Sequence, residues 1–142
     1  MVIGEKLWEG KGKSSGPGFI KSVGMNGVTS MYSWNAEMKG IGRAKGIDGN
    51  INVTATSMSP PKGIAAAKDQ GVFMTMTGDM GVLKGFDLMK MTPGGKPSSV
   101  GLWSFMTMSE KLSWLNEIIA LVTFEALDPM WMEFKITINE WK

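Results

Sequence analysis

Short runs of alternating apolar and polar residues, separated by glycine-rich turns, restrict this chain to a β architecture. The 142 residues include 19 glycines, which are spread along the chain rather than gathered as in a flexible linker. This spacing is typical of many short strands joined by tight turns. The run 131–141 is the clearest example, since Phe134, Ile136 and Ile138 alternate with polar residues. The pattern predicts an antiparallel sheet with one apolar and one polar face.

Two dipeptides indicate hairpins in the N-terminal part of the chain. Asn26-Gly27 and Asp48-Gly49 each separate two runs of alternating residues. Such pairs allow the positive φ angles that two-residue hairpin turns require. Centring the hairpins on them predicts one long strand over residues 28–46. A kink or bulge is expected near Gly40 and Gly42, because the side chains there become small.

The first of these turns places Phe19 opposite Trp34 and Lys21 opposite Tyr32. With a period of two, Tyr32, Trp34 and Met38 then share one apolar face. An inward Lys21 beside Tyr32 could anchor a carboxylate or carbonyl at the end of an apolar cavity. Alternatively, Lys21 extends from a strand end into solvent. The candidate ligand-binding residues are therefore Phe19, Lys21, Tyr32, Trp34 and Met38.

The rest of the sequence predicts further strands and one short helix. Strands are expected at residues 72–77, 82–91, 100–108, 118–127 and 131–141, a loop at 57–68, and a helix over 109–116 with Ser109 as its N-cap. About eight antiparallel strands leave two exposed edges unless the sheet closes. We therefore expect a mainly β fold in which residues 1–142 form a single antiparallel barrel domain of about eight strands. A two-sheet β-sandwich is the alternative.

The segment around residues 71–85 resembles a known group of barrels. Gly71-Val72-Phe73, Thr77-Gly78 and Gly85 follow the order of a strand, a glycine turn and a glycine that opens the next strand. In these residues the chain is similar to calycin-like β-barrels of the allene oxide cyclase and dirigent type. Asp79 stands where that pattern has a second turn glycine. The resemblance implies an eight-stranded antiparallel barrel with an apolar cavity, often oligomeric, and it transfers no catalytic residue to this chain.

Composition excludes several classes of site. The chain contains no histidine and no cysteine, which removes disulfides, thiol nucleophiles, serine–histidine triads and metal sites built on these residues. No metal and no cofactor are expected. The 14 methionines could bind Cu(I), but their spread through the expected strands favours core packing or an adaptable apolar cavity. A net charge of +2 and a single arginine, Arg43, argue against a nucleic-acid partner.

Apolar segments bear on location and assembly. The longest apolar run, 118–122, is far shorter than the roughly 20 residues of a membrane-spanning helix. The first residues also lack the pattern of a signal peptide, so a cytoplasmic location is expected. Residues 118–127 are apolar on both faces, and four tryptophans have no obvious common core: Trp8, Trp103, Trp131 and Trp141. This surplus predicts a homo-oligomer, with a covering loop or helix as the alternative.

These observations favour a barrel that binds a small apolar or amphipathic molecule in its interior. One alternative is a cyclase- or isomerase-like enzyme on the same barrel, and another is a self-assembling interaction protein with a filled core. Asp87 and Glu125 lie in apolar runs, where they could be buried acids or could face water at a strand edge. An open pocket would favour binding or catalysis, and a buried ionisable group at its base would favour an enzyme.

Overall fold

The computed structural model describes residues 3–16, 18–91 and 96–142, in which nine antiparallel strands form one sheet. Every strand from β2 to β8 pairs with the next strand in the chain, and the order across the sheet is β1-β9-β8-β7-β6-β5-β4-β3-β2. The elements are β1 (Ile3–Ser14), β2 (Phe19–Gly24), β3 (Gly27–Gly40), the 3-10 turn η1 (Gly42–Ala44), β4 (Gly49–Ser59), β5 (Ala65–Thr75), β6 (Met80–Met91), β7 (Pro97–Thr107), the 3-10 turn η2 (Ser113–Glu117), β8 (Ile119–Ala126) and β9 (Glu133–Trp141).

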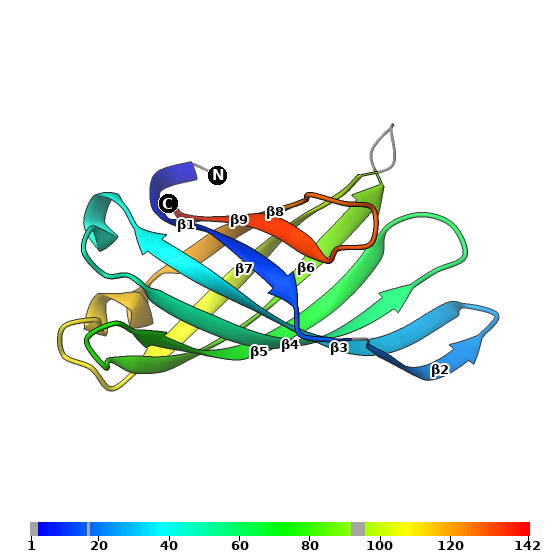
Figure 1. The fold of residues 1–142 in the computed structure, drawn as a ribbon, viewed down its shortest axis with the longest axis horizontal. Helices are drawn as coiled ribbons and strands as arrows, with labels where there is room; N and C mark the ends of the chain where they lie inside the picture. The colour runs from blue at the N-terminus through cyan, green and yellow to red at the C-terminus, as the bar shows by residue number, and fades with distance from the viewer. Residues whose placement is uncertain (1–2, 17, 92–95) are drawn as a thin grey trace.

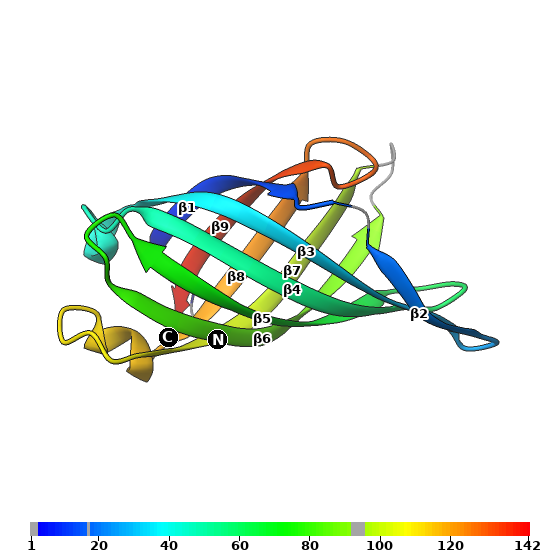
Figure 2. The same ribbon diagram turned by 60° about the horizontal axis from the view of Figure 1, so that its bottom comes forward.

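The sheet closes because β1 is paired along both of its edges. Gly10 of β1 faces Ile136 of β9 on one side and Met38 of β3 on the other. Strands β1 and β3–β9 therefore form a closed eight-stranded antiparallel barrel, to which β2 is added as an extra strand. Figures 1 and 2 show the strands wrapped around a common interior. The predicted mainly β barrel is confirmed, and closure excludes the sandwich.

The hairpin of β2 and β3 extends beyond the barrel wall, as Figure 2 shows. β2 pairs with residues 27–31 of β3, whereas β1 pairs with residues 34–40 of the same strand. Gly24 faces Gly27, so the two turn residues are Met25 and Asn26. The turn therefore lies one residue earlier than predicted, and Gly27, with a φ of 131°, ends it.

The expected register between these two strands is wrong. A bulge between Ile20 and Ser22 shifts the pairing, and Phe19 faces Met31 rather than Trp34. Lys21 lies within this bulge and does not pair with Tyr32. The alternation expected along β3 nevertheless holds in its second half, where Trp34, Ala36 and Met38 are buried while Glu37 and Lys39 are exposed.

The connection from β3 to β4 is longer than predicted. β3 ends at Gly40 and η1 follows, so the hairpin is not centred on Asp48-Gly49. Instead, the Asp48 Oδ1 atom accepts a hydrogen bond of 2.9 Å from the backbone N–H of Gly40. A Cβ on Gly40 would lie 1.9 Å from the carbonyl oxygen of Ala44, so this tight loop needs glycine. The small residues near Gly40 and Gly42, where a kink was expected, therefore mark the end of β3.

Two further segments differ in structure from the sequence-based expectation. β4 continues to Ser59 and β5 begins at Ala65, so much of the stretch expected as a loop at 57–68 is strand. The segment 109–116 contains a turn at residues 109–112 and the first part of the 3-10 turn η2, and the Leu112 N–H donates to the Ser109 Oγ atom at 3.3 Å within the first of these. Ser109 therefore caps a turn rather than the predicted helix, since a segment this short cannot nucleate an α-helix by itself. Within the described residues, no helix is long and apolar enough to cross a membrane.

Aromatic rings fill the middle of the barrel. Trp34 stacks on Trp103 with ring centroids 6.0 Å apart, and it meets Phe124 and Phe134 edge-on at 5.5 and 5.2 Å. All four side chains are buried. A Cβ on Gly12 of β1 would lie 2.4 Å from the Phe134 ring, so glycine on one strand makes room for an aromatic ring from its neighbour. We name Trp34, Trp103, Phe124 and Phe134 the aromatic layer.

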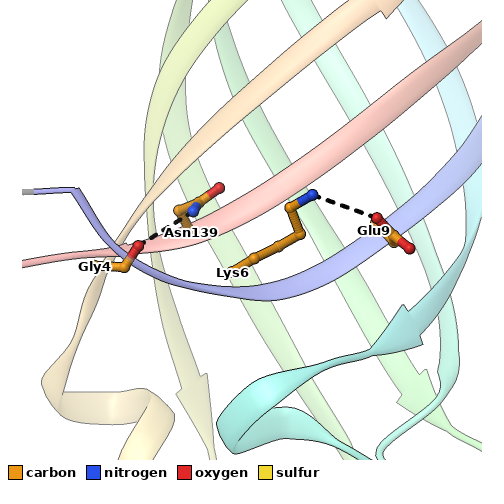
Figure 3. Close-up of polar contacts among 4 residues, drawn as sticks. All are labelled: Gly4, Lys6, Glu9 and Asn139. Atoms are coloured by element: carbon orange, nitrogen blue, oxygen red, sulfur yellow. Dashed lines mark hydrogen bonds and ion pairs between the residues drawn. The ribbon is translucent and has the colours of Figure 1, made fainter.

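The first strand bends where it starts to pair with the last. Its pairing with β9 shifts twice between Ile3 and Trp8, and both Leu7 and Trp8 are buried as a result. In this stretch the Asn139 Nδ2 atom donates to the Gly4 carbonyl oxygen at 3.2 Å, and Lys6 lies 3.5 Å from Glu9 (Figure 3). Side-chain contacts thus supplement the backbone ladder where it is irregular.

Candidate functional site

One end of the barrel is closed by η1, η2 and the side chains beneath them. The rings of Trp8 and Trp114 stack at 6.0 Å with an angle of 3° between their planes. The Trp8 indole N–H donates to the Ile47 carbonyl oxygen at 2.8 Å. The Arg43 guanidinium lies 4.4 Å from the centroid of the Trp114 ring. The cavity left at this end is about 40 Å³, too small for an organic ligand.

The other side of the aromatic layer holds a much larger cavity of about 660 Å³. Its mouth is formed by exposed residues that include Gly16, Gly18, Met130 and Met132. This volume lies in the range of small-molecule sites. The wall is part aromatic and part polar, and its other residues are Ser14, Ser30, Tyr32, Ser33, Trp34, Ser57, Ser59, Asp69, Asp87, Met89, Ser99, Phe124, Trp131 and Phe134.

Two buried aspartates lie side by side in the polar wall of the cavity. Asp69 of β5 faces Gly85 in the register, and Ala67 faces Asp87 of β6, so the aspartates are diagonal neighbours on the inner surface. The Asp69 Oδ2 atom accepts a 3.1 Å hydrogen bond from the Trp103 indole N–H. The Asp87 Oδ2 atom accepts a hydrogen bond from the Ser99 hydroxyl. The Asp87 Oδ1 atom is buried and has no hydrogen-bond partner among the described residues.

The pKa of Asp69 is raised to about 8, and burial is the largest cause. The negative charge of Asp87 and a hydrogen bond with its carboxylate contribute to this rise, whereas the hydrogen bond from Trp103 opposes it. At neutral pH the aspartate pair, Asp69 and Asp87, therefore shares one proton and carries one negative charge. The shared proton also provides a hydrogen-bond donor for the Asp87 Oδ1 atom, which accepts no other hydrogen bond from the described residues.

Hydroxyl groups surround the aspartate pair. Burial, and then the charges of Asp87 and Asp69, raise the pKa of the Tyr32 phenol, which keeps it protonated and able to donate a hydrogen bond. The Ser30 and Ser57 hydroxyls lie 3.1 Å apart on the neighbouring strands. Among the described residues that line this cavity there is no lysine or arginine. The polar wall thus offers hydroxyls and carboxyls without a countercharge.

Trp131 stands at the mouth, on the loop between β8 and β9. Its φ of 57° lies in the left-handed region, which a bulky residue rarely adopts. Its ring meets Phe134 at a centroid distance of 5.9 Å. The loop is held by the Asp128 carboxylate, which accepts hydrogen bonds of 2.9–3.1 Å from three backbone N–H groups, those of Met130, Met132 and Glu133. These bonds lower the pKa of Asp128.

The structure brings two of the five candidate residues together. Tyr32 and Trp34 line the large cavity, whereas Met38 lines the small cavity at the closed end. Phe19 is 61 % exposed on the projecting β2 strand, and Lys21 is exposed beside it. Of the two orientations considered for Lys21, the inward one is therefore wrong, and the side chain is exposed to solvent. The ionisable groups beside Tyr32 are acidic rather than basic.

Asp69 is the principal residue that the sequence did not reveal. Residues 57–68 were expected to form a loop, so the strand periodicity was not extended back through Asp69. With β5 beginning at Ala65, the inward positions are Ala65, Ala67, Asp69, Gly71 and Phe73, and the acid falls on the inner face. Of the two acids that the sequence did identify, Asp87 is buried and Glu125 is exposed.

Comparison with known proteins identifies the fold. The sequence matches no family profile and no curated protein. Among solved structures, the chain is similar to a β-barrel-like protein from Acinetobacter baumannii AYE, with a TM-score of 0.82 at 16 % identity over 99 % of this chain and 96 % of that chain. A protein of unknown function from Clostridium acetobutylicum matches with a TM-score of 0.80 at 10 % identity, covering 96 % of each chain.

A third similar structure is described as an enzyme from Penicillium herquei. It matches with a TM-score of 0.66 at 17 % identity, over 96 % of this chain and 92 % of that chain. The barrel implied by the resemblance near residues 71–85 is thus confirmed, although none of these structures is described as a calycin or dirigent-type protein. At such low identities the comparisons establish a small β-barrel protein and no activity.

Proposed function

We propose that this barrel binds a small amphipathic molecule in the large cavity. The observation that carries the proposal is a cavity of about 660 Å³ whose wall is aromatic on one part and polar on another. An apolar body would lie against Trp34, Phe124 and Phe134, and a polar group would reach Tyr32 and the aspartate pair. A filled interior, as expected for a purely self-assembling protein, would leave no such space.

Nile red, a neutral dye that fluoresces in apolar surroundings, tests this proposal. We expect saturable binding to the purified protein, together with a co-purified small molecule in native mass spectra. Ser57→Leu places a larger side chain in the cavity wall and should weaken dye binding about tenfold. Thr54→Leu is the matched control, because Thr54 is on the outer face of the same strand. Equal dye binding by both variants, or no saturable binding at all, would contradict the proposal.

A second candidate function is a cyclase- or isomerase-like enzyme on the same barrel. The raised pKa of Asp69 supports it, since a carboxyl group that titrates near neutral pH can donate and accept protons. The resemblance to allene oxide cyclase-type barrels points in the same direction. The compound identified by native mass spectrometry should then be converted by the wild-type protein. Asp69→Asn should bind it without conversion, whereas a binding protein would leave it unchanged in both cases.

We also propose that the protein forms a homo-oligomer through its outer face. Trp8 and Trp103 belong to the core and no longer argue for an interface. Neighbouring outward residues of β6, β7 and β8 nevertheless remain 43–52 % exposed, namely Phe86, Leu88, Val100 and Ile119. Such a patch is typical of association surfaces. Light scattering during size-exclusion chromatography tests this, and a monomer at micromolar concentration would contradict it.

A further inference from the structure

We propose that the molecule bound in the large cavity is an organic cation: a protonated amine carried on an apolar or aromatic body. This inference rests on the proposed binding function and adds the chemical class of the ligand. It is carried by three features of the cavity wall. These are the buried aspartate pair, the absence of a basic side chain among the described lining residues, and the aromatic side chains that line the cavity.

The aspartate pair supplies a negative charge, and no lysine or arginine lies beside it among the described residues of the cavity wall. Asp69 and Asp87 are 5 % and 9 % exposed, and their described hydrogen-bond donors are the neutral groups of Trp103 and Ser99. A buried charge without a counterion is costly, because the surrounding medium solvates it poorly. An ammonium group would offset this cost, because its positive charge would pair with the negative charge of the two carboxyl groups.

Aromatic rings provide the second component of a cation site. Trp34, Phe124, Phe134 and Trp131 all line the cavity. The faces of such rings attract cations, and the attraction increases where water is excluded. The same rings would pack against the apolar body of an amphipathic amine. Charge and shape of the wall therefore favour the same class of ligand.

Other ligand classes fit this wall less well. A carboxylate or phosphate would be repelled by the aspartate pair and would find no basic partner among the described lining residues. A neutral alcohol could donate one hydrogen bond but would leave the buried charge uncompensated. The protein as a whole carries a net charge of +2, which disfavours nonspecific attraction of cations. A preference for amines would therefore have to arise locally, in the cavity.

Three probes of nearly equal size separate these classes. They are 2-phenylethylamine, 2-phenylethanol and phenylacetate, which share one apolar body and differ in the charge of the end group. Their binding at pH 7 can be measured by displacement of Nile red and by calorimetry. We expect the amine to bind about tenfold more tightly than the alcohol, and phenylacetate to bind most weakly.

Variants locate the preference in the aspartate pair. Asp87→Asn removes the charge at nearly constant shape, so the amine should lose its advantage while the alcohol still binds. Replacing both acids, Asp69→Asn together with Asp87→Asn, is the second route, because no carboxyl group then remains in the pair to carry the charge. Glu125→Gln is the matched control, because Glu125 is exposed on the outside of β8 and its loss changes the net charge equally. This control should retain the full preference for the amine.

The outcomes distinguish this inference from the proposed function on which it rests. If Nile red and 2-phenylethanol bind as well as the amine, or phenylacetate binds best, the cavity is a binding site but the ligand is not a cation. If the amine preference persists unchanged in both aspartate variants, the charge of the pair does not cause it, and the inference is overturned. If neither the dye nor any probe binds, the proposed function fails and the inference fails with it.

Discussion

The indole N–H of Trp103 donates a hydrogen bond of 3.1 Å to the Asp69 carboxylate across the width of one intervening strand. Asp69, Gly85 and Trp103 occupy one row across β5, β6 and β7. The residue between them is a glycine, and a Cβ at this position would lie 2.6 Å from the Trp103 Cδ1 atom. The missing side chain of Gly85 thus allows a ring of the aromatic layer to reach the acid in the cavity wall.

Gly85→Ala should therefore destabilise the protein. The added Cβ would lie 2.0 Å from the Leu102 carbonyl oxygen as well as against the Trp103 ring, so backbone and ring must both move. We expect the free energy of unfolding to fall by about 1–3 kcal/mol, as measured by urea denaturation. Gly24→Ala is the matched control, because a Cβ there meets nothing within 4 Å. Equal losses in the two variants would contradict this account of Gly85.

Trp103→Phe retains an aromatic ring but removes the hydrogen bond to Asp69. Loss of a buried donor to a carboxyl group should reduce the free energy of unfolding by about 1–3 kcal/mol. Because this bond lowers the pKa of Asp69, its removal should raise that pKa above its wild-type value of about 8. Carboxyl carbon shifts in an NMR titration would report the change. An unchanged or lower pKa would show that the bond does not stabilise the ionised form of Asp69.

The stability of the protein should decrease as the pH rises from 5 to 8. A carboxyl group in the unfolded chain titrates at about 3.9, whereas folding raises the pKa of Asp69 to about 8. Between these values the folded state binds one more proton than the unfolded state, so the free energy of unfolding falls with pH, by at most about 1.4 kcal/mol per unit. Urea denaturation across this range measures the slope.

Other shifted groups act outside this pH window. The lowered pKa values of Asp79 and Asp128 affect stability only in acid, below the range of an unfolded carboxyl group. The raised pKa of Tyr32 acts only above the range of an unfolded phenol. Asp69→Asn should therefore flatten the stability profile between pH 5 and 8. If Asp69→Asn keeps the wild-type dependence of the free energy of unfolding on pH, a group other than Asp69 binds the extra proton of the folded state.

The barrel could be predicted from the sequence because its signals are local. Alternation through 131–141 and through the second half of β3 places Phe134, Ile136 and Trp34 on the inner face, as the structure has them. The hairpin registers could not be predicted in the same way. One connection has a bulge at Lys21, and in the other the Gly40 backbone N–H donates to the Asp48 carboxylate. The dipeptide patterns encode neither feature.

The candidate site was predicted only in part, for the same physical reason. Tyr32 and Trp34 follow from the period of one strand, but the aspartate pair depends on the pairing of β5 with β6. That pairing brings Asp69 beside Asp87 only if β5 begins well before Val72. The strand begins with three alanines, which do not alternate between apolar and polar residues and so do not indicate a strand. The charge of the site is therefore opposite to the expected one, since Lys21 is exposed on β2 while two carboxyl groups line the cavity.

Trp131 links backbone strain to the cavity mouth. A bulky residue at a φ of 57° costs about 1–2 kcal/mol relative to glycine, and strained residues of this kind are common at ligand sites. Trp131→Gly should relieve this strain and so offset much of the lost ring packing, leaving the free energy of unfolding nearly unchanged. It should nevertheless weaken Nile red binding about tenfold, because the ring no longer covers the mouth. Trp131→Phe keeps a ring in place and should retain most of the affinity. If Trp131→Gly binds the dye as tightly as Trp131→Phe, the aromatic ring contributes nothing to binding. The left-handed conformation of Trp131 is then unrelated to the cavity.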